Sequence, residues 1–210
     1  LGGDLLPDKN KETILATGFN RNHKITQEGG VIDEEYRIEY VTDRTNTFGK
    51  GLLAMTFECA KCHDHKYDPI SQKDYFSTFA FFDQVDEKGL VGDISLASLA
   101  DPPYMTITKE DKEGILSFIS KLDTGKVDVM IMKDSTGIRK TKLLERGVYD
   151  RPGEVVSPGT PESILKYDPK KFKQNRLGLA KWMFDSQNPL TARVFVNFIC
   201  QEFFGKGIVK

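Results

Sequence analysis

Five consecutive residues, Cys59-Ala60-Lys61-Cys62-His63, constrain this chain more than any other stretch of its sequence. Two cysteines three residues apart lie on the same side of a helical turn, and the histidine follows at once. CxxCH is the spacing with which two thiols bond covalently to a haem while the next imidazole binds its iron. The motif therefore predicts a helical turn whose two thiols hold haem c, with His63 as an axial ligand of the iron.

The ligand on the opposite face of the iron stays open. His65 is excluded beside His63, because two residues span at most about 7 Å and axial ligands approach from opposite faces. His23 or a methionine is a candidate, and a five-coordinate iron is a further alternative. The methionines are Met55, Met105, Met130, Met132 and Met183. An iron with a protein ligand in the sixth position would favour electron transfer, whereas an iron with that position vacant would permit catalysis or binding of a small ligand.

Zinc binding is the main alternative for the same residues. Cys59 and Cys62 would form a knuckle with His65 as the third ligand. His23 or Cys200 would be the fourth, but no second CxxC or HxxxH pair in the sequence specifies it. A thioredoxin-like dithiol fits less well, because the motif does not follow a strand in a βαβ pattern.

Composition and charge exclude several classes of protein. The chain has 210 residues, 39% of them hydrophobic, which is enough for one large domain or two small ones. Lys and Arg number 30 against 31 Asp and Glu, so no overall field attracts nucleic acid. The sequence contains no run of about 18 apolar residues, so it predicts no transmembrane segment.

Two further expectations concern the cysteines and the ends of the chain. Three cysteines do not make a disulfide framework, and Cys200 is expected to be a buried free thiol within an apolar stretch. The opening LGGD is neither a signal peptide nor a starting methionine, so a fragment or a processed product is expected.

Helix signals bracket the motif. Residues 33–55 predict a helix with Asp33 as N-cap, and two glycines, Gly49 and Gly51, are expected to separate a shorter helix over residues 52–57. Ser71 and Asp74 give the start signal of another helix. Its aromatic stripe lines a haem pocket or, as is more usual, forms ordinary core. The stripe consists of Tyr75, Phe76, Phe79 and Phe82.

Polar residues 64–68 follow the motif and precede Pro69. They either hold the haem propionates and the axial imidazole or form a polar turn that Pro69 closes.

The second half of the chain changes in character. Thr108 and Asp111 predict the start of a helix that carries apolar residues to position 122. Residues 127–132 and 139–144 predict two strands joined as a hairpin by residues 134–137. Helices are expected again after Asn175 and over residues 191–204. The expected fold class is mainly α with a small β-hairpin region: a helical haem-bearing segment followed by a mixed α+β segment.

Several motifs together resemble the planctomycete-type cytochrome c proteins. In that family a DUF1549 (PSCyt2) domain ends in a CHDHKYDP-type motif, and a DUF1553 (PSD1) domain follows it. The motifs of the first domain are TGFNRN at residues 17–22, DEEYR at 33–37 and CAKCHDHKYDPI at 59–70. Those of the second are RGVY at 146–149, NRLGLAKW at 175–182 and NPLTARV at 188–194.

The resemblance assigns residues 1–100 to the C-terminal part of the DUF1549-like cytochrome domain, and residues 101–210 to a connecting region and the N-terminal part of the DUF1553-like domain. It implies haem and an extracytoplasmic location, in the periplasm or exported to the cell surface. It also implies partners: a redox protein or an upstream cytochrome c domain, and the rest of the same polypeptide. The chain departs from the family at Phe198-Ile199-Cys200, where relatives often carry Arg-Phe-Trp or Arg-Met-Trp.

The expected function is that of a c-type haem-binding redox protein, which transfers electrons within a larger extracytoplasmic oxidoreductase. Two alternatives remain: a zinc-stabilised structural or binding module, and a module that binds a surface polysaccharide or a protein. The aromatic-rich second half supports the latter, because it carries no catalytic motif of its own and exposed aromatic side chains would serve binding. The sequence names no substrate, electron donor or acceptor.

Overall fold

The structure is a computed structural model that describes residues 1–91, 100–108, 110–111 and 126–209. It is mainly α-helical with two small antiparallel sheets, which confirms the predicted fold class. The α-helices are α1 (Lys11–Leu15), α2 (Asp33–Leu53), α3 (Gln72–Phe82), α5 (Arg176–Met183) and α6 (Thr191–Phe204). The 3-10 helices are η1 (Gly3–Leu5), η2 (Ala16–Arg21), η3 (Phe57–Lys61) and η5 (Glu145–Gly147). The strands are β1 (Tyr104–Thr108), β2 (Lys126–Met130), β3 (Lys142–Leu144) and β4 (Pro152–Val155).

The chain forms two compact units, each built from two stretches that are far apart in the sequence. The first unit comprises Leu1–Tyr40 and Val85–Gly137, and the second comprises Val41–Gln84 and Ile138–Lys210. The division at residue 100 that the sequence suggested concerns family segments, and it stays a prediction.

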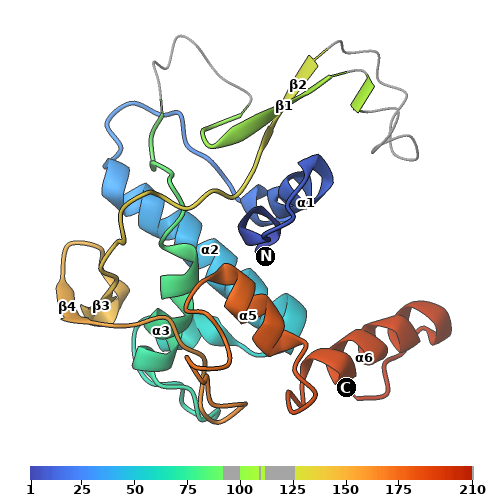
Figure 1. Cartoon of the computed structure of the whole chain (residues 1–210). Helices are drawn as coiled ribbons and strands as arrows, with labels where there is room; N and C mark the ends of the chain where they lie inside the picture. The colour runs from blue at the N-terminus through green and yellow to red at the C-terminus, as the bar shows by residue number, and fades with distance from the viewer. Residues whose placement is uncertain (92–99, 109, 112–125, 210) are drawn as a thin grey trace. The chain divides into compact units, whose positions relative to one another are not determined.

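In the first unit, β1 and β2 form an antiparallel pair (Figure 1). The pairing runs from Tyr104 opposite Met130 to Thr108 opposite Lys126. The hydroxyl of Thr17, in η2, accepts a hydrogen bond of 2.8 Å from the Met132 backbone N–H, which fixes the chain just after β2. Thr108 and Asp111 make the hydrogen bonds of the predicted helix start. The apolar residues expected to follow lie outside the described residues.

In the second unit, α3 is the centre of the core. Ser71 and Asp74 form the predicted capping box, in which each side chain bonds the backbone N–H of the other residue. The four side chains of the aromatic stripe are buried. The rings of Tyr75, Phe76 and Phe79 pack on one another, with the Phe76 and Phe79 centroids 5.6 Å apart. The Phe82 ring packs 6.0 Å from that of Phe48, in α2. The stripe is therefore core, the more usual of its two interpretations.

The predicted hairpin is wrong, although both of its strands form. The first predicted strand is β2, which pairs with β1; the second is β3, which pairs with β4 (Figure 1). Asp134 forms a bridge with Val85, and Arg139 exchanges two hydrogen bonds with the side chain of Gln84. The two predicted strands thus belong to different units and pair with other partners.

The predicted break at Gly49 and Gly51 is also wrong, because α2 runs without interruption to Leu53. A Cβ at Gly49 would lie 2.7 Å from Cγ of Phe57, so this glycine permits close packing of the chain that follows the helix. Ala54 ends α2 with a left-handed φ of 51°. The expected helix over residues 52–57 is replaced by the end of α2 and by η3.

Two findings concern the C-terminal helices. Asn175 caps α5 as predicted, with its side chain accepting from the Gly178 N–H. Cys200 is free, but it is half-exposed on α6 and not buried as expected, because α6 buries none of its residues against the rest of the described chain. In the part of the chain that the structure describes, no helix combines the length and apolarity needed to cross a bilayer.

A candidate site of two thiols and one imidazole

The CxxCH motif begins in η3 and extends past its end, between α2 and α3. Cys62 is the C-cap of η3, and His63 follows it. The Cys62 backbone N–H donates to the Cys59 carbonyl at 3.3 Å and closes the turn. Side chains three residues apart eclipse one another in a 3-10 helix, so both thiols lie on one side of the turn. Both are free and exposed. The predicted helical turn is confirmed, in its tighter form.

The imidazole of His63 is held by the residue that follows it. Its Nδ1 lies 2.7 Å from the carbonyl oxygen of Asp64. A carbonyl oxygen only accepts, so Nδ1 carries the proton and the lone pair of the neutral ring is on Nε2. Metal-binding histidines are commonly fixed in this tautomer by a backbone carbonyl. Because the residue is exposed, His63 is well suited to bind a metal ion through Nε2.

His65 has the opposite tautomer. Its Nδ1 accepts hydrogen bonds from the backbone N–H groups of Tyr67, at 3.3 Å, and Asp68, at 2.7 Å. The neutral ring then carries its proton on Nε2 and has no lone pair left for a metal. The Asp68 carboxylate lies 3.5 Å from the same Nδ1, but an unprotonated nitrogen forms no ion pair with it. These bonds argue against His65 as a ligand.

The polar residues after the motif form a closed turn. The His65 N–H donates to the Ile70 carbonyl at 2.9 Å, and the Asp64 carboxylate accepts from the Gln72 N–H at 2.8 Å. The hydrogen bonds support the interpretation of residues 64–68 as a polar turn. The Asp64 carbonyl also holds the imidazole of His63. The role of these residues toward haem stays a prediction.

A segment distant in the sequence lies against the CxxC turn. The Gln72 side-chain Nε2 donates to the Lys61 carbonyl at 2.8 Å and to the Leu144 carbonyl at 3.1 Å. Gly147, in the turn between β3 and β4, has a left-handed φ of 72°. A Cβ at Gly147 would lie 3.2 Å from Sγ of Cys62 and 2.9 Å from Cγ of Lys61. The β3–β4 turn is thus in close contact with the Cys62 side of the motif.

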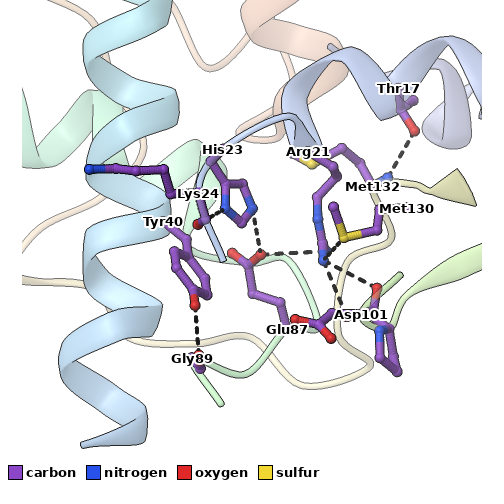
Figure 2. A network of polar contacts seen from close by, with 11 residues as sticks. Thr17, Arg21, His23, Lys24, Tyr40, Glu87, Gly89, Asp101, Met130 and Met132 are labelled. Carbon is purple, nitrogen blue, oxygen red and sulfur yellow. Dashed lines mark hydrogen bonds and ion pairs between the residues drawn. The ribbon is translucent and has the colours of Figure 1, made fainter. Parts of the chain in front are cut away.

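His23, the other candidate ligand, lies in a buried polar cluster of the first unit (Figure 2). Its Nδ1 donates to the Lys24 carbonyl at 2.8 Å, and its ring stacks on Tyr40 with centroids 4.5 Å apart. Nε2 lies 3.8 Å from the carboxylate of Glu87. The Tyr40 hydroxyl in turn donates to the Gly89 carbonyl at 2.7 Å. His23 therefore faces an acidic side chain in the protein interior.

Arg21 neutralises that acidic side chain. Its Nη1 lies 3.4 Å from Glu87, and the two side chains are 2% and 1% exposed. Nη2 donates to the carbonyls of Asp101 and Pro102 (Figure 2). Burial lowers the pKa of Arg21 to about 10 and raises the pKa of Asp101, and each charge partly offsets the effect on the other. Arg21 stays charged at neutral pH, so the cluster is a buried ion pair that ties together three stretches of the first unit.

The candidate methionines are mostly engaged in packing. Met132 and Met183 are buried, and the Sδ of Met130 accepts a weak hydrogen bond from Arg21. Among the described residues, no group of three or more His, Cys, Asp and Glu side chains is arranged to hold a metal ion. The residues of the motif fit haem c without such a group, because attachment needs two thiols and one imidazole from the protein.

Sequence analysis missed Gln72 and Gly147 at the candidate site, as well as Arg21 and Glu87 in the buried cluster. Gln72 has no local signal, because its partners are 11 and 72 residues away along the chain. Gly147 lies in the RGVY motif, but only the fold shows that its Cα faces a thiol.

Comparison with known proteins finds two families that are similar to parts of the chain. No curated protein and no solved structure matches the chain. A protein family of unknown function, DUF1549 (PSCyt2), matches residues 1–87, which include the CxxCH turn and α3. A second family of unknown function, DUF1553 (PSD1), matches residues 175–210, which include α5 and α6. The chain is therefore similar to DUF1549 over residues 1–87 and to DUF1553 over residues 175–210.

Proposed function

We propose that this protein attaches haem c through Cys59 and Cys62 and binds the iron through Nε2 of His63. One observation carries the proposal: the Nδ1–H of His63 is held by a carbonyl, which leaves Nε2 as the metal-binding nitrogen next to two exposed thiols on one turn. We propose electron transfer within a larger extracytoplasmic oxidoreductase as the role of the site.

The chemistry of attachment needs no residue beyond these three. Each thiol would add across one vinyl group of haem, with sulfur bonding to one vinyl carbon and a proton going to the other, so that nothing would be oxidised and no group would leave. When bound, haem would supply one-electron chemistry at its iron. His63 would fix the orientation of the ring through a single bond whose direction the Asp64 carbonyl sets.

The proposed partners are a redox protein or a further cytochrome c domain, together with the rest of the same polypeptide. Net charge gives no reason to expect nucleic acid, since acidic and basic side chains nearly balance at a net charge of -1. Haem attachment would place the protein outside the cytoplasm, in the periplasm or at the cell surface.

Intact mass under denaturing conditions, with a reduced-minus-oxidised visible spectrum, tests this proposal on protein from its own extracytoplasmic source. Wild type should carry the added mass of one haem. The double variant Cys59→Ala, Cys62→Ala should lose it, whereas Cys200→Ala, the matched control, should keep it. An unmodified mass together with stoichiometric zinc would contradict the haem proposal and support the zinc alternative.

A second candidate function, binding of another protein chain, is favoured by the exposure of α6. Large apolar side chains on and around this helix are between 41% and 80% exposed. They are Phe184, Phe195, Val196, Phe198, Ile199, Phe203 and Phe204. A helix that exposes this many large apolar side chains is typical of an interaction site. A photo-crosslinker at position 203, used in the native source, should capture a protein chain. If the crosslinker reacts with water alone and no cross-linked protein forms, this role is contradicted.

A further inference from the structure

The side chain of Gln72 joins the CxxC turn to the β3–β4 turn. Its Nε2 carries two N–H groups, and each is used by a different carbonyl: Lys61 at 2.8 Å and Leu144 at 3.1 Å. Lys61 lies between the two cysteines, so one of these bonds fixes the backbone of the turn that carries both thiols. Leu144 is the last residue of β3, so the other bond fixes the strand that leads to Gly147.

Gly147 shows what this connection does at the thiols. With Leu144 held by Gln72, the backbone at Gly147 approaches Cys62 so closely that an added Cβ would lie 3.2 Å from Sγ. The preceding residue, Arg146, has a left-handed φ of 53°. Such a conformation is costly for a residue with a side chain and persists where the surroundings impose it. The close approach of Gly147 is therefore to Cys62, whereas Cys59 lies at the other end of the CxxC turn.

We propose that Gln72 is a positioning residue for the thiol pair. It holds the CxxC turn and the β3–β4 turn together, so that the backbone at Gly147 limits the movement and the access of the Cys62 sulfur. For haem attachment, which rests on the proposed function, the consequence is that both sulfurs are presented at a fixed separation. Loss of Gln72 would allow the Cys62 sulfur to drift from the position that the second thioether requires.

The experiment compares Gln72→Leu with Gln84→Leu. Gln84 makes the same kind of two-bond connection in the same unit: its Nε2 donates to the Arg139 carbonyl and its Oε1 accepts from the Arg139 N–H, both at 2.9 Å. The two variants thus lose matched bonds, one set at the thiols and the other away from them. In haem-free recombinant protein, the alkylation rate of each cysteine is measured by peptide mass spectrometry.

Gln72→Leu should raise the rate at Cys62 severalfold relative to Cys59, whereas Gln84→Leu should leave this ratio unchanged. A purely structural role predicts a different result, because general loosening would raise the rates at Cys59, Cys62 and Cys200 together. A ratio in Gln72→Leu equal to that of wild type would overturn the proposal.

Gly147→Ala provides a second variant should Gln72→Leu fail to fold. Its Cβ would meet Lys61 and Cys62, so the ratio of Cys62 to Cys59 should change. Gly137→Ala, where a Cβ meets no atom within 4 Å, should leave it unchanged. An unchanged ratio in Gly147→Ala would also count against the proposal.

A haem readout separates this inference from the proposed function. In protein from the native source, Gln72→Leu should yield a fraction attached through a single thioether, and Gln84→Leu should be attached through two. A wild type without haem would overturn the proposed function, and the alkylation ratio would still decide the role of Gln72.

Discussion

Two histidines of this protein make the same local contact in different surroundings. His23 donates its Nδ1–H to the carbonyl of Lys24 at 2.8 Å, and His63 donates its Nδ1–H to the carbonyl of Asp64 at 2.7 Å. In the first unit, Nε2 of His23 is buried and faces Glu87 at 3.8 Å. In the second unit, His63 is exposed beside two free thiols.

The contrast shows that the contact with the following carbonyl sets the tautomer, whereas the tertiary surroundings decide what the second nitrogen does. At His23 the second nitrogen faces a buried ion pair between Arg21 and Glu87. At His63 it is available to a metal. Substitutions in the first unit should therefore change stability, and substitutions at the motif should change cofactor binding.

The largest expected effect is that of Arg21→Met. The variant keeps most of the buried volume but removes the positive charge 3.4 Å from Glu87, in a site where both side chains are at most 2% exposed. Breaking a buried ion pair on one side costs about 3–5 kcal/mol. Urea unfolding measures the loss, and a change below about 1 kcal/mol would show that the cluster does not stabilise the first unit.

The next effect compares the two histidines directly. His23→Ala should destabilise the protein by about 2–3 kcal/mol, because it removes a buried ring stacked on Tyr40. His63→Ala should change the unfolding free energy by less than about 0.5 kcal/mol, as is usual for an exposed side chain. It should nevertheless alter the visible spectrum of haem-loaded protein. The comparison fails if both variants lose similar stability.

The smallest effect contrasts a partly exposed ion pair with the buried one: the Lys171 side chain is 53% exposed and that of Asp185 is 8% exposed. Lys171 pairs with Asp185 and lowers the pKa of that carboxyl below its usual value of 3.8. A lowered carboxyl pKa contributes stability above the usual pKa, and this stability is lost as the pH falls through the lowered value. Lys171→Met should therefore be slightly less stable than wild type at pH 7 and equal to it once Asp185 is protonated in both. A difference that grew toward low pH would contradict the assigned sign.

The sequence was sufficient where the signal is local. The capping box at Ser71 and Asp74, the N-cap Asn175 and the turn that carries the two thiols all depend on residues within four positions of one another, and all three are found. For the aromatic stripe, core was the more usual of the two interpretations, and its side chains are buried.

Contacts between distant segments were not predictable in this way. Two strands were identified correctly, but their partners, β1 and β4, lie elsewhere in the sequence and carry no local signal of the pairing. The Gln72 bonds and the approach of Gly147 to Cys62 likewise join residues that only the folded chain brings together. The sequence thus identified the two thiols and the imidazole of the site, whereas the contacts of Gln72 and Gly147 with the CxxC turn are seen only in the folded chain.

Long-range proton–nitrogen NMR correlation on haem-free protein tests the central claim most directly, because it reads the tautomer of each imidazole at a pH where the rings are neutral. The structure predicts a proton on Nδ1 and a lone pair on Nε2 for His63, and the reverse for His65. A His63 ring with its proton on Nε2 would contradict the account, because the nitrogen assigned to the metal would then have no lone pair to give.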